Sequence, residues 1–401
     1  MAGRGWSAEI FVAEYRDLQA TAMGVDRTGQ YAILAGRKQL AIVDLDDPIE
    51  KVRRIARHSK YEVGVVQWNP HESHRDLFVV ASNQSAEISC WLADKVESKG
   101  MLKGHTRVIS DLDWSYFDAD WVATCSVDTY IYLWDIRDTR KPAVSLSAVA
   151  GASQVKWNKK SCNLIATAHE SDVRIWDQRK GTTPVQYIAA HLSKVHGLDW
   201  SPTQEWSLAT SSQDCHVKLW DVCNPRKPES TISSGAPVWR ARYTPFGEGL
   251  VTVVVPQLRR GDNSLLLWNI NDVSVPVHTF VGHQDVILEF QWRKLGDDSK
   301  DFHLVTWSKD QSLRIWNIDS HLQKTCRHDL LNDSGNEADV DSAVEAMSNT
   351  SRDAPREQPP PVATATRAAA AVATVTSPGQ TLQQEFSLVN MQIDNISIDS
   401  H

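Results

Sequence analysis

The chain has 401 residues, and 41% of them are hydrophobic, so it can bury a sizeable core. The formal net charge is -8, and residues 327–401 hold 4 Arg and no Lys against 11 Asp or Glu, so the excess lies in the C-terminal part. The nearly neutral remainder offers no basic footprint for nucleic acid. Six cysteines without a Cys-x-x-Cys pair argue against a zinc site and against a disulfide framework. The N-terminus lacks the apolar core of a signal peptide, and the most apolar run, residues 249–256, is too short to span a bilayer.

From residue 10 to about residue 322 the chain consists of short β-prone runs separated by Gly, Asp, Asn and Pro, without helical periodicity. Tryptophan recurs in these runs at intervals of 43, 42, 44, 48 and 48 residues, at Trp91, Trp134, Trp176, Trp220, Trp268 and Trp316. A second aromatic series precedes the first by about 20 residues. Self-similarity at about 40–45 residues is typical of β-propeller blades.

Counting the repeats predicts seven blades, which start near residues 20, 62, 107, 151, 194, 236 and 285. The last repeat holds only three strands, and residues 10–15 form a spare strand at the N-terminus. We therefore expect the N-terminal strand to complete the seventh blade, because closing the ring removes exposed strand edges.

The repeats resemble the WD-repeat family over residues 1–322. The family's Gly-His pair stands at residues 104–105 and 282–283, with a near match at 190–191, and a Ser-x-Asp run precedes the tryptophan of each of these repeats. The resemblance implies a buried chain of hydrogen bonds from Trp to Ser, from Ser to His and from His to Asp. Its members are His105, Ser126, Asp128 and Trp134; His191, Ser212, Asp214 and Trp220; and His283, Ser308, Asp310 and Trp316.

The other repeats depart from the pattern. The fourth has Glu170 where Asp is expected, the second has Ser85, and the sixth keeps Asp262 without a matching His. The first repeat lacks the tryptophan. Such degenerate blades are usual in the family and leave the predicted fold unchanged.

His, Asp and Ser could also form a hydrolytic triad, but an active site does not need to recur three times in phase with a tryptophan. The sequence shows no His-rich metal motif and no phosphate-binding loop. An enzyme on a propeller scaffold would need titratable groups around the central channel, and the first strands hold mostly Val, Leu, Asp and Trp. We therefore expect no enzymatic activity, no cofactor, no metal and no small-molecule substrate.

Two features are candidate protein-binding sites. Residues 255–261 lengthen the connection between the second and third strands of blade six and include Arg259 and Arg260, although a merely tolerated insertion explains them equally well. Arg137 and Arg179 end two Trp-Asp-x-Arg runs, a pattern by which some WD-repeat substrate receptors dock on cullin ubiquitin ligases. Such runs are also common in the family without that role.

Beyond the repeats, residues 323–379 are acidic, then rich in Pro and Ala, which predicts a disordered linker. Residues 380–401 place apolar groups first at helical and then at strand spacing, which is similar to the start of an RWD domain. We interpret this last segment as a truncated domain.

Several strings resemble the WD-repeat subunits of the GATOR assembly, which promotes TOR kinase signalling in response to amino acids. These strings lie at residues 150–160, 190–194, 237–246, 265–269, 280–283, 288–293 and 382–388. The resemblance implies a scaffold subunit of the activating subcomplex, cytoplasmic and peripheral on the lysosomal or vacuolar membrane through its partners. The implied partners are other GATOR subunits, including propeller-fold proteins, with no nucleic acid and no direct membrane insertion.

Overall fold

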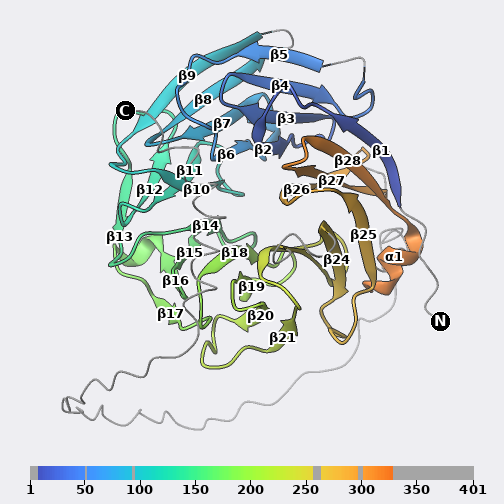
Figure 1. Ribbon diagram of the computed structural model, residues 1–401. Coiled ribbons are helices and arrows are strands. Elements are labelled where there is room, and N and C mark those ends of the chain that lie inside the picture. The colour runs from blue at the N-terminus through green and yellow to red at the C-terminus, as the bar shows by residue number, and fades with distance from the viewer. Residues whose placement is uncertain (1–7, 50–51, 93–94, 256–262, 297–300, 328–401) are drawn as a thin grey trace, which may run out of the picture. The chain divides into compact units, whose positions relative to one another are not determined.

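The computed structural model describes residues 8–49, 52–92, 95–255, 263–296 and 301–327. All of them belong to the first of the two units of the chain, Met1–Leu330. This unit contains seven antiparallel four-stranded sheets, arranged as blades in a ring around a central channel (Figure 1). The predicted all-β, seven-bladed propeller is therefore confirmed.

In every blade the first strand lies at the channel and the last at the outer rim. Blade one has β2 (Ala20–Val25), β3 (Tyr31–Gly36), β4 (Gln39–Asp44) and β5 (Val52–Ala56). Blade two has β6 (Val65–Trp68), β7 (Leu77–Ser82), β8 (Ser85–Leu92) and β9 (Lys95–Lys103). Blade three has β10 (Ile109–Trp114), β11 (Trp121–Ser126), β12 (Tyr130–Asp135) and β13 (Val144–Ser147). Blade four has β14 (Gln154–Trp157), β15 (Leu164–His169), β16 (Asp172–Asp177) and β17 (Gln186–Ile188).

Blade five has β18 (Val195–Trp200), β19 (Ser207–Ser212), β20 (His216–Asp221) and β21 (Ser230–Ser233). Blade six has β22 (Val238–Tyr243), β23 (Gly249–Val254), β24 (Asn263–Asn269) and β25 (His278–His283). Blade seven has β26 (Ile287–Lys294), β27 (Phe302–Ser308), β28 (Ser312–Ile318) and, outermost, β1 (Glu9–Glu14). The first strands begin within about three residues of the predicted blade starts.

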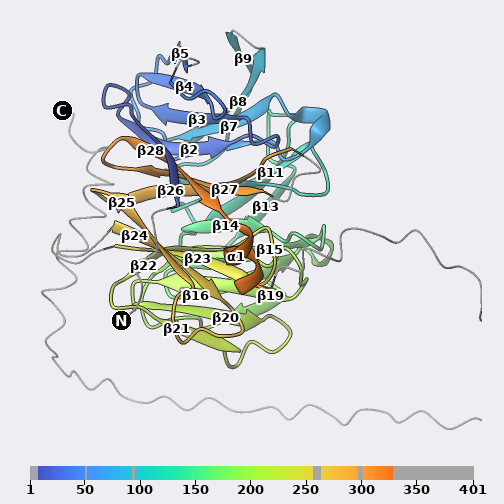
Figure 2. The same cartoon turned by 90° about the vertical axis from the view of Figure 1, so that its right-hand side faces the viewer.

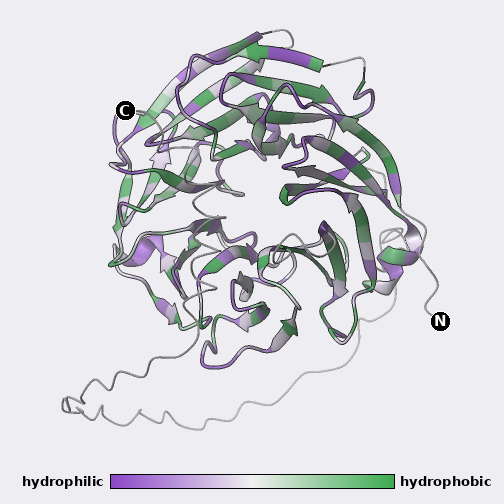
Figure 3. Ribbon diagram, viewed as in Figure 1, coloured by the Kyte–Doolittle hydropathy of each residue, from purple (hydrophilic) through white to green (hydrophobic). Residues whose placement is uncertain are grey.

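Burial along the strands follows from their place in the ring. The second strands are buried almost end to end, and β11 and β19 use small side chains (Ala, Thr, Ser, Cys) that let neighbouring blades approach closely. Several third strands begin with alternating buried and partly exposed positions, as in β12 and β20, which matches the period of two of a half-buried strand, whereas β4 is buried almost end to end. Hydrophobic residues accordingly follow the strands of every blade (Figure 3).

The ring closes through the N-terminal strand, as predicted. β1 pairs antiparallel with β28, with Phe11 opposite Ile315 and Ala13 opposite Leu313. Beyond the ladder, the amide of Tyr15 donates to the carbonyl of Gln311 at 2.8 Å. The first and last strands of the unit therefore share one sheet, and the outer edge of β28 is covered by β1.

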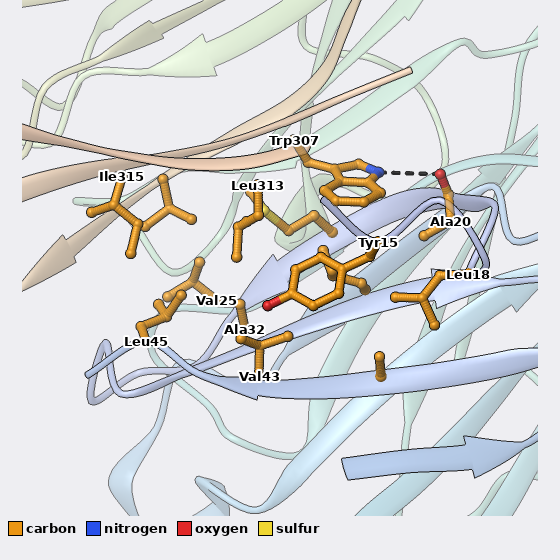
Figure 4. Close-up of a cluster of buried hydrophobic side chains, with 14 residues drawn as sticks. Tyr15, Leu18, Ala20, Val25, Ala32, Val43, Leu45, Trp307, Leu313 and Ile315 are labelled. Carbon is orange, nitrogen blue, oxygen red and sulfur yellow. Dashed lines mark hydrogen bonds between the residues drawn. The ribbon is translucent and has the colours of Figure 1, made fainter. Parts of the chain in front are cut away.

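The core is divided among the interfaces between blades, and the cluster between blades seven and one shows how they pack (Figure 4). Trp307 is fully buried there, and its indole N–H donates to the carbonyl of Ala20 at 3.1 Å. The ring of Tyr15 lies 6.4 Å from that of Trp307, and the Tyr15 hydroxyl donates to the carbonyl of Pro48. One tryptophan thus contributes both apolar area and a hydrogen bond across the blade boundary.

After β28 the chain forms the short helix α1 (Ser320–Thr325), which the side chain of Asp319 caps by accepting from the amide of Leu322 at 2.8 Å. The helix lies beside blade six (Figure 2), where the amide of Glu248 donates to the carbonyl of Cys326. Cys326 is completely buried in that contact. Ordered structure thus crosses position 323, where the sequence predicted a linker to begin. The rest of that linker and the predicted domain start at 380–401 lie outside the described residues.

Candidate functional site

The most regular polar feature is a hydrogen-bonded chain inside blade three. The indole N–H of Trp134 donates to the hydroxyl of Thr124 at 2.9 Å, and that hydroxyl lies 2.8 Å from Nε2 of His105. Nδ1 of His105 is 3.0 Å from Asp128, whose carboxylate also accepts from the amide of Thr106. The chain ties β11, β12, the turn between them and the loop into the blade together, and all its side chains are nearly or fully buried.

The same chain recurs in blades five and seven, where the tryptophan donates to Thr210 and Thr306 at 3.0 and 2.9 Å. His191 and His283 lie 2.7 Å from these hydroxyls and 3.0 and 3.3 Å from Asp214 and Asp310. In each of the three sets the predicted His, Asp and Trp are joined, but through a threonine that the sequence interpretation omitted.

The predicted role of the serines was wrong. Ser126 does not reach the tryptophan; it donates to the carbonyl of Arg107 and accepts from the amide of Asp128. Ser212 and Ser308 make the equivalent bonds. Side chains of a strand alternate between its two faces, so the residue two positions earlier, on the same face but deeper in the blade, meets the indole. A Thr two residues before the Ser is the signal that would have found it.

The protons in these chains can be assigned from the partners. Burial lowers the pKa of His105, His191 and His283, so the imidazoles are neutral at pH 7. A neutral imidazole whose Nδ1–H donates to Asp can accept the threonine O–H at Nε2, and every donor then has an acceptor. The contacts between His and Asp are therefore hydrogen bonds to a carboxylate rather than ion pairs.

Blade four lacks the loop histidine and the aspartate of the buried chain, and a histidine from its own second strand takes their place. Trp176 donates to Thr167 at 2.8 Å, and that hydroxyl lies 2.8 Å from Nε2 of His169. Nδ1 of His169 donates to the carbonyl of Ala150 at 2.9 Å, so no carboxylate is required. Burial lowers the pKa of His169 to about 4. In blade six only the first bond remains, from Trp268 to Thr252, and the predicted Asp262 lies outside the described residues.

Steric crowding explains why the residue before His105 is a glycine. A Cβ on Gly104 would lie 3.1 Å from the ring of Trp134 and 3.2 Å from the ring of Tyr132. The loop that carries His105 thus runs directly over the indole, and a side chain there would push the imidazole away from its threonine.

The central channel is charged, which corrects the expectation that titratable groups do not converge there. Lys156 lies 2.7 Å from Asp111 and 3.9 Å from Asp113, and Lys159 lies 2.7 Å from Asp199. On the other side, Glu289 pairs with Arg240 at 3.3 Å and also with Arg242. The sequence analysis considered the composition of the first strands one by one, whereas the ring brings the charged residues of β10, β14, β22 and β26 together.

These carboxylates also accept hydrogen bonds from backbone amides of the neighbouring blade. Asp113 accepts from the amide of Trp157 at 2.8 Å, and Asp199 accepts from the amide of Tyr243 at 2.9 Å. The first strand of a blade has no strand on its channel side, so side chains of the preceding blade satisfy its free amides. The channel groups therefore hold consecutive blades together.

A cavity of about 240 Å³ lies among these channel residues. Burial raises the pKa of Asp113 to about 6, although Lys156 and the amide of Trp157 act in the opposite direction. Among the residues that the structure describes, no group of three or more His, Cys, Asp or Glu could hold a metal ion. In the same part of the chain no helix is long and apolar enough to cross a membrane.

Arg137 and Arg179 lie on the face formed by the loops between the first and second strands and between the third and fourth strands. Arg137 donates to Asp135 through Nε at 2.8 Å, and Arg179 donates to Asp177 through Nε at 3.0 Å. Both side chains are about two-thirds exposed, at 64% and 66%. Arg179 also lines a cavity of about 330 Å³ between blades three and four, together with Phe117.

Arg259 and Arg260 lie outside the described residues. The segment that contains them joins β23 to β24, so both its ends lie on the other face of the ring. We call this the crossover face, because it carries the loops that cross from one blade to the next, at residues 57–64, 104–108, 148–153 and 189–194. It also carries the turns between the second and third strands.

The seven sheets and the Trp–Thr–His–Asp chains define the class of this protein: the chain belongs to the WD-repeat β-propeller family. The family model "WD domain, G-beta repeat" matches residues 96–135 and 182–221. The whole chain is similar to the GATOR2 complex protein WDR59 of Homo sapiens, with 53% identity over 420 residues, and to WDR59 of Gallus gallus, with 54% identity over 416 residues. It spans 42% of the length of each of these relatives.

A chain of the solved structure "Crystal Structure of Mitotic Checkpoint Complex" has the same fold. The two superpose with a TM-score of 0.66 over 79% of this chain and 93% of that chain, at 17% identity. This similarity concerns the fold alone.

Proposed function

We propose that this chain is a non-enzymatic scaffold subunit of the GATOR2 complex, which promotes amino-acid-dependent TOR signalling. The observation that supports the proposal is identity above 50%, along the whole chain, to proteins named as GATOR2 complex subunits. The geometry is consistent with a scaffold, because the buried polar chains and the channel ion pairs are satisfied internally. We further propose that the chain is cytoplasmic and reaches the lysosomal membrane through partners, which include propeller-fold subunits.

Affinity purification of the chain from amino-acid-fed cells, followed by mass spectrometry, tests this proposal. We expect the other GATOR2 subunits among the recovered proteins, and lysosomal co-fractionation that disappears when those subunits are depleted. Recovery of none of them, from a chain that remains folded, would refute it.

A second candidate is a substrate receptor of a cullin ubiquitin ligase. Its support is the exposure of Arg137 and Arg179 on one face, each held in a fixed orientation by its aspartate. The double variant R137A/R179A separates the two functions. Loss of cullin adaptors with GATOR2 subunits retained favours the receptor, and unchanged recovery of all partners excludes it.

A further inference from the structure

One of the six cysteines lines the cavity of about 330 Å³ between blades three and four. Cys162 is exposed there, in the loop between β14 and β15, and the side-chain amide of Gln178 donates to its carbonyl at 2.7 Å. Phe117 and Trp121 contribute aromatic surface to the same cavity. The volume lies at the lower end of the range of ligand pockets in proteins, so a small molecule held at Cys162 has room and apolar surface.

Two unused donors at this cavity fit an anionic group. Arg179 bonds to Asp177 through Nε and Nη2, which leaves Nη1 without a partner among the described residues. Trp157 is only 2% exposed, and its indole N–H has no acceptor in the part of the chain that the structure describes. A buried donor without an acceptor is unfavourable, so its presence in a cavity wall points to a ligand that accepts. Asp118 is the only carboxylate among the described lining residues, and it can face an ammonium group.

The other five cysteines have surroundings that disfavour the thiolate. Burial raises the pKa of all five, which are Cys90, Cys125, Cys215, Cys223 and Cys326. Cys223 is exposed like Cys162, but the carboxylate of Asp221 raises its pKa further. Because the thiolate is the form that attacks a disulfide, we expect these five cysteines to react slowly.

Cys162 differs because it shares its cavity with a guanidinium group. The pKa of Arg179 is raised mainly by its hydrogen bond to Asp177 and further by the charge of the Cys162 thiolate, so the two side chains lie close together. Cysteines that react readily are typically exposed beside a cation. Cys162 therefore combines access, a cationic neighbour and a cavity that can hold the group that becomes attached.

We propose that Cys162 is a site of reversible modification by a small acidic thiol, which reacts as its disulfide. The Cys162 thiolate attacks one sulfur of the disulfide, so a new S–S bond joins Cys162 to one half while the old S–S bond breaks. The other half leaves as a thiolate and takes up a proton from water. The Cys162 sulfur is oxidised, the departing sulfur is reduced, and a free thiol reverses the step.

The attached half is held by the charges of the cavity. Its carboxylate pairs with Arg179, its ammonium group with Asp118, and its apolar part packs on Phe117. The match to both charges favours a short peptide thiol, which carries carboxylate and ammonium groups together. The modification covers Arg179 and its surroundings on this face of the ring. It does not depend on the chain being a GATOR2 subunit.

The first experiment uses glutathione disulfide as the probe, because each half carries carboxylates and an ammonium group. The purified, reduced full chain is incubated with the probe, and intact mass and peptide mapping locate the adduct. We expect modification of Cys162 to be about tenfold faster than that of Cys223, and dithiothreitol to remove it. C162S should form no fast adduct, and C223S should behave as wild type. Equal rates at Cys162 and Cys223 overturn the proposal.

The second experiment separates recognition by the cavity from simple exposure of the thiol. R179M should slow the reaction with glutathione disulfide by about fivefold or more, and the reaction with the uncharged bis(2-hydroxyethyl) disulfide clearly less. R140M is the matched control, because Arg140 bonds to Asp138 in the same way on the same face but lies outside the cavity. It should leave both rates unchanged. An equal effect of R179M on both probes, or no effect on either, at unchanged melting temperature overturns the proposal.

Discussion

The hydroxyl of Thr124 lies 2.9 Å from the indole nitrogen of Trp134, ten residues further along the chain and on the adjacent strand. This pair recurs in five blades, at Thr124, Thr167, Thr210, Thr252 and Thr306. The histidine joins it in four of them and the aspartate in three. The Trp–Thr bond is thus the constant part of the buried chain, and the loop residues are additions to it.

We predict that T124V destabilises the protein more than S126A does. T124V leaves both the indole N–H and Nε2 of His105 without a partner, and each buried unsatisfied group costs about 1–3 kcal/mol. Ser126 contributes only two bonds to the backbone, so its loss should cost about 1 kcal/mol. Urea unfolding of both variants provides the comparison, with T252V as an intermediate case, because no histidine joins the Trp–Thr bond of blade six. A larger loss in S126A than in T124V would contradict the assignment.

Lys156 should be essential to the stability of the channel. K156M removes the cation from Asp111 and Asp113, two buried carboxylates, and removing one partner of a buried pair costs about 3–5 kcal/mol. The double variant K156M/D111N should recover part of that loss, because one unpaired charge is gone. Thermal unfolding measures both. A melting temperature for K156M equal to that of wild type would show that the ion pairs do not stabilise the ring.

The N-terminal strand should be required for ring closure. Deleting residues 1–14 removes β1 and leaves β28 with an open edge and an uncovered apolar face, formerly covered by Phe11 and Ala13. We expect oligomers in size-exclusion chromatography and faster amide exchange in β28. Deleting residues 1–7 alone is the control and should change neither property. A monomeric, fully protected ring after the longer deletion would rule out this closure.

Stability should fall as the pH drops from about 6.5 towards 4. Burial lowers the pKa of His169, His196 and His303 to about 4, while an unfolded histidine titrates near 6.5. Between these values the unfolded chain binds more protons, so the free energy of unfolding decreases by up to about 1.4 kcal/mol per pH unit for each histidine. Asp113 acts oppositely, because its raised pKa favours the folded state below about pH 6.

Urea midpoints between pH 7.5 and 4.5 measure this dependence. The variant H169Q should have a shallower slope than wild type, because one of the titrating histidines is gone. A slope that is flat in wild type, or unchanged in H169Q, would disprove the proposed cause.

The sequence predicted those features that repeat along the chain. The tryptophan interval and the spare strand at residues 10–15 were enough for the blade count and for the closure by β1, because both are properties of order along the chain. Thr124 was missed, although it stands two residues before the predicted Ser126, because the expected motif directed attention to the serine. His169 was missed because it replaces a loop histidine from a strand, which no fixed spacing predicts.

Features that depend on how different blades meet could not be predicted from the sequence. Lys156 and Asp111 are 45 residues apart, and their distance of 2.7 Å follows only from placing two first strands side by side. Neighbouring blades therefore determine the channel, while each repeat by itself determines only its strands.

The central claim is that this propeller binds other GATOR2 subunits directly, and reconstitution from purified proteins tests it best. The purified chain is mixed with the purified remaining subunits, and the mixture is resolved by size-exclusion chromatography with detection of each protein. We predict that the chain elutes with those subunits in one complex. Separate elution of a correctly folded wild-type chain would contradict the account.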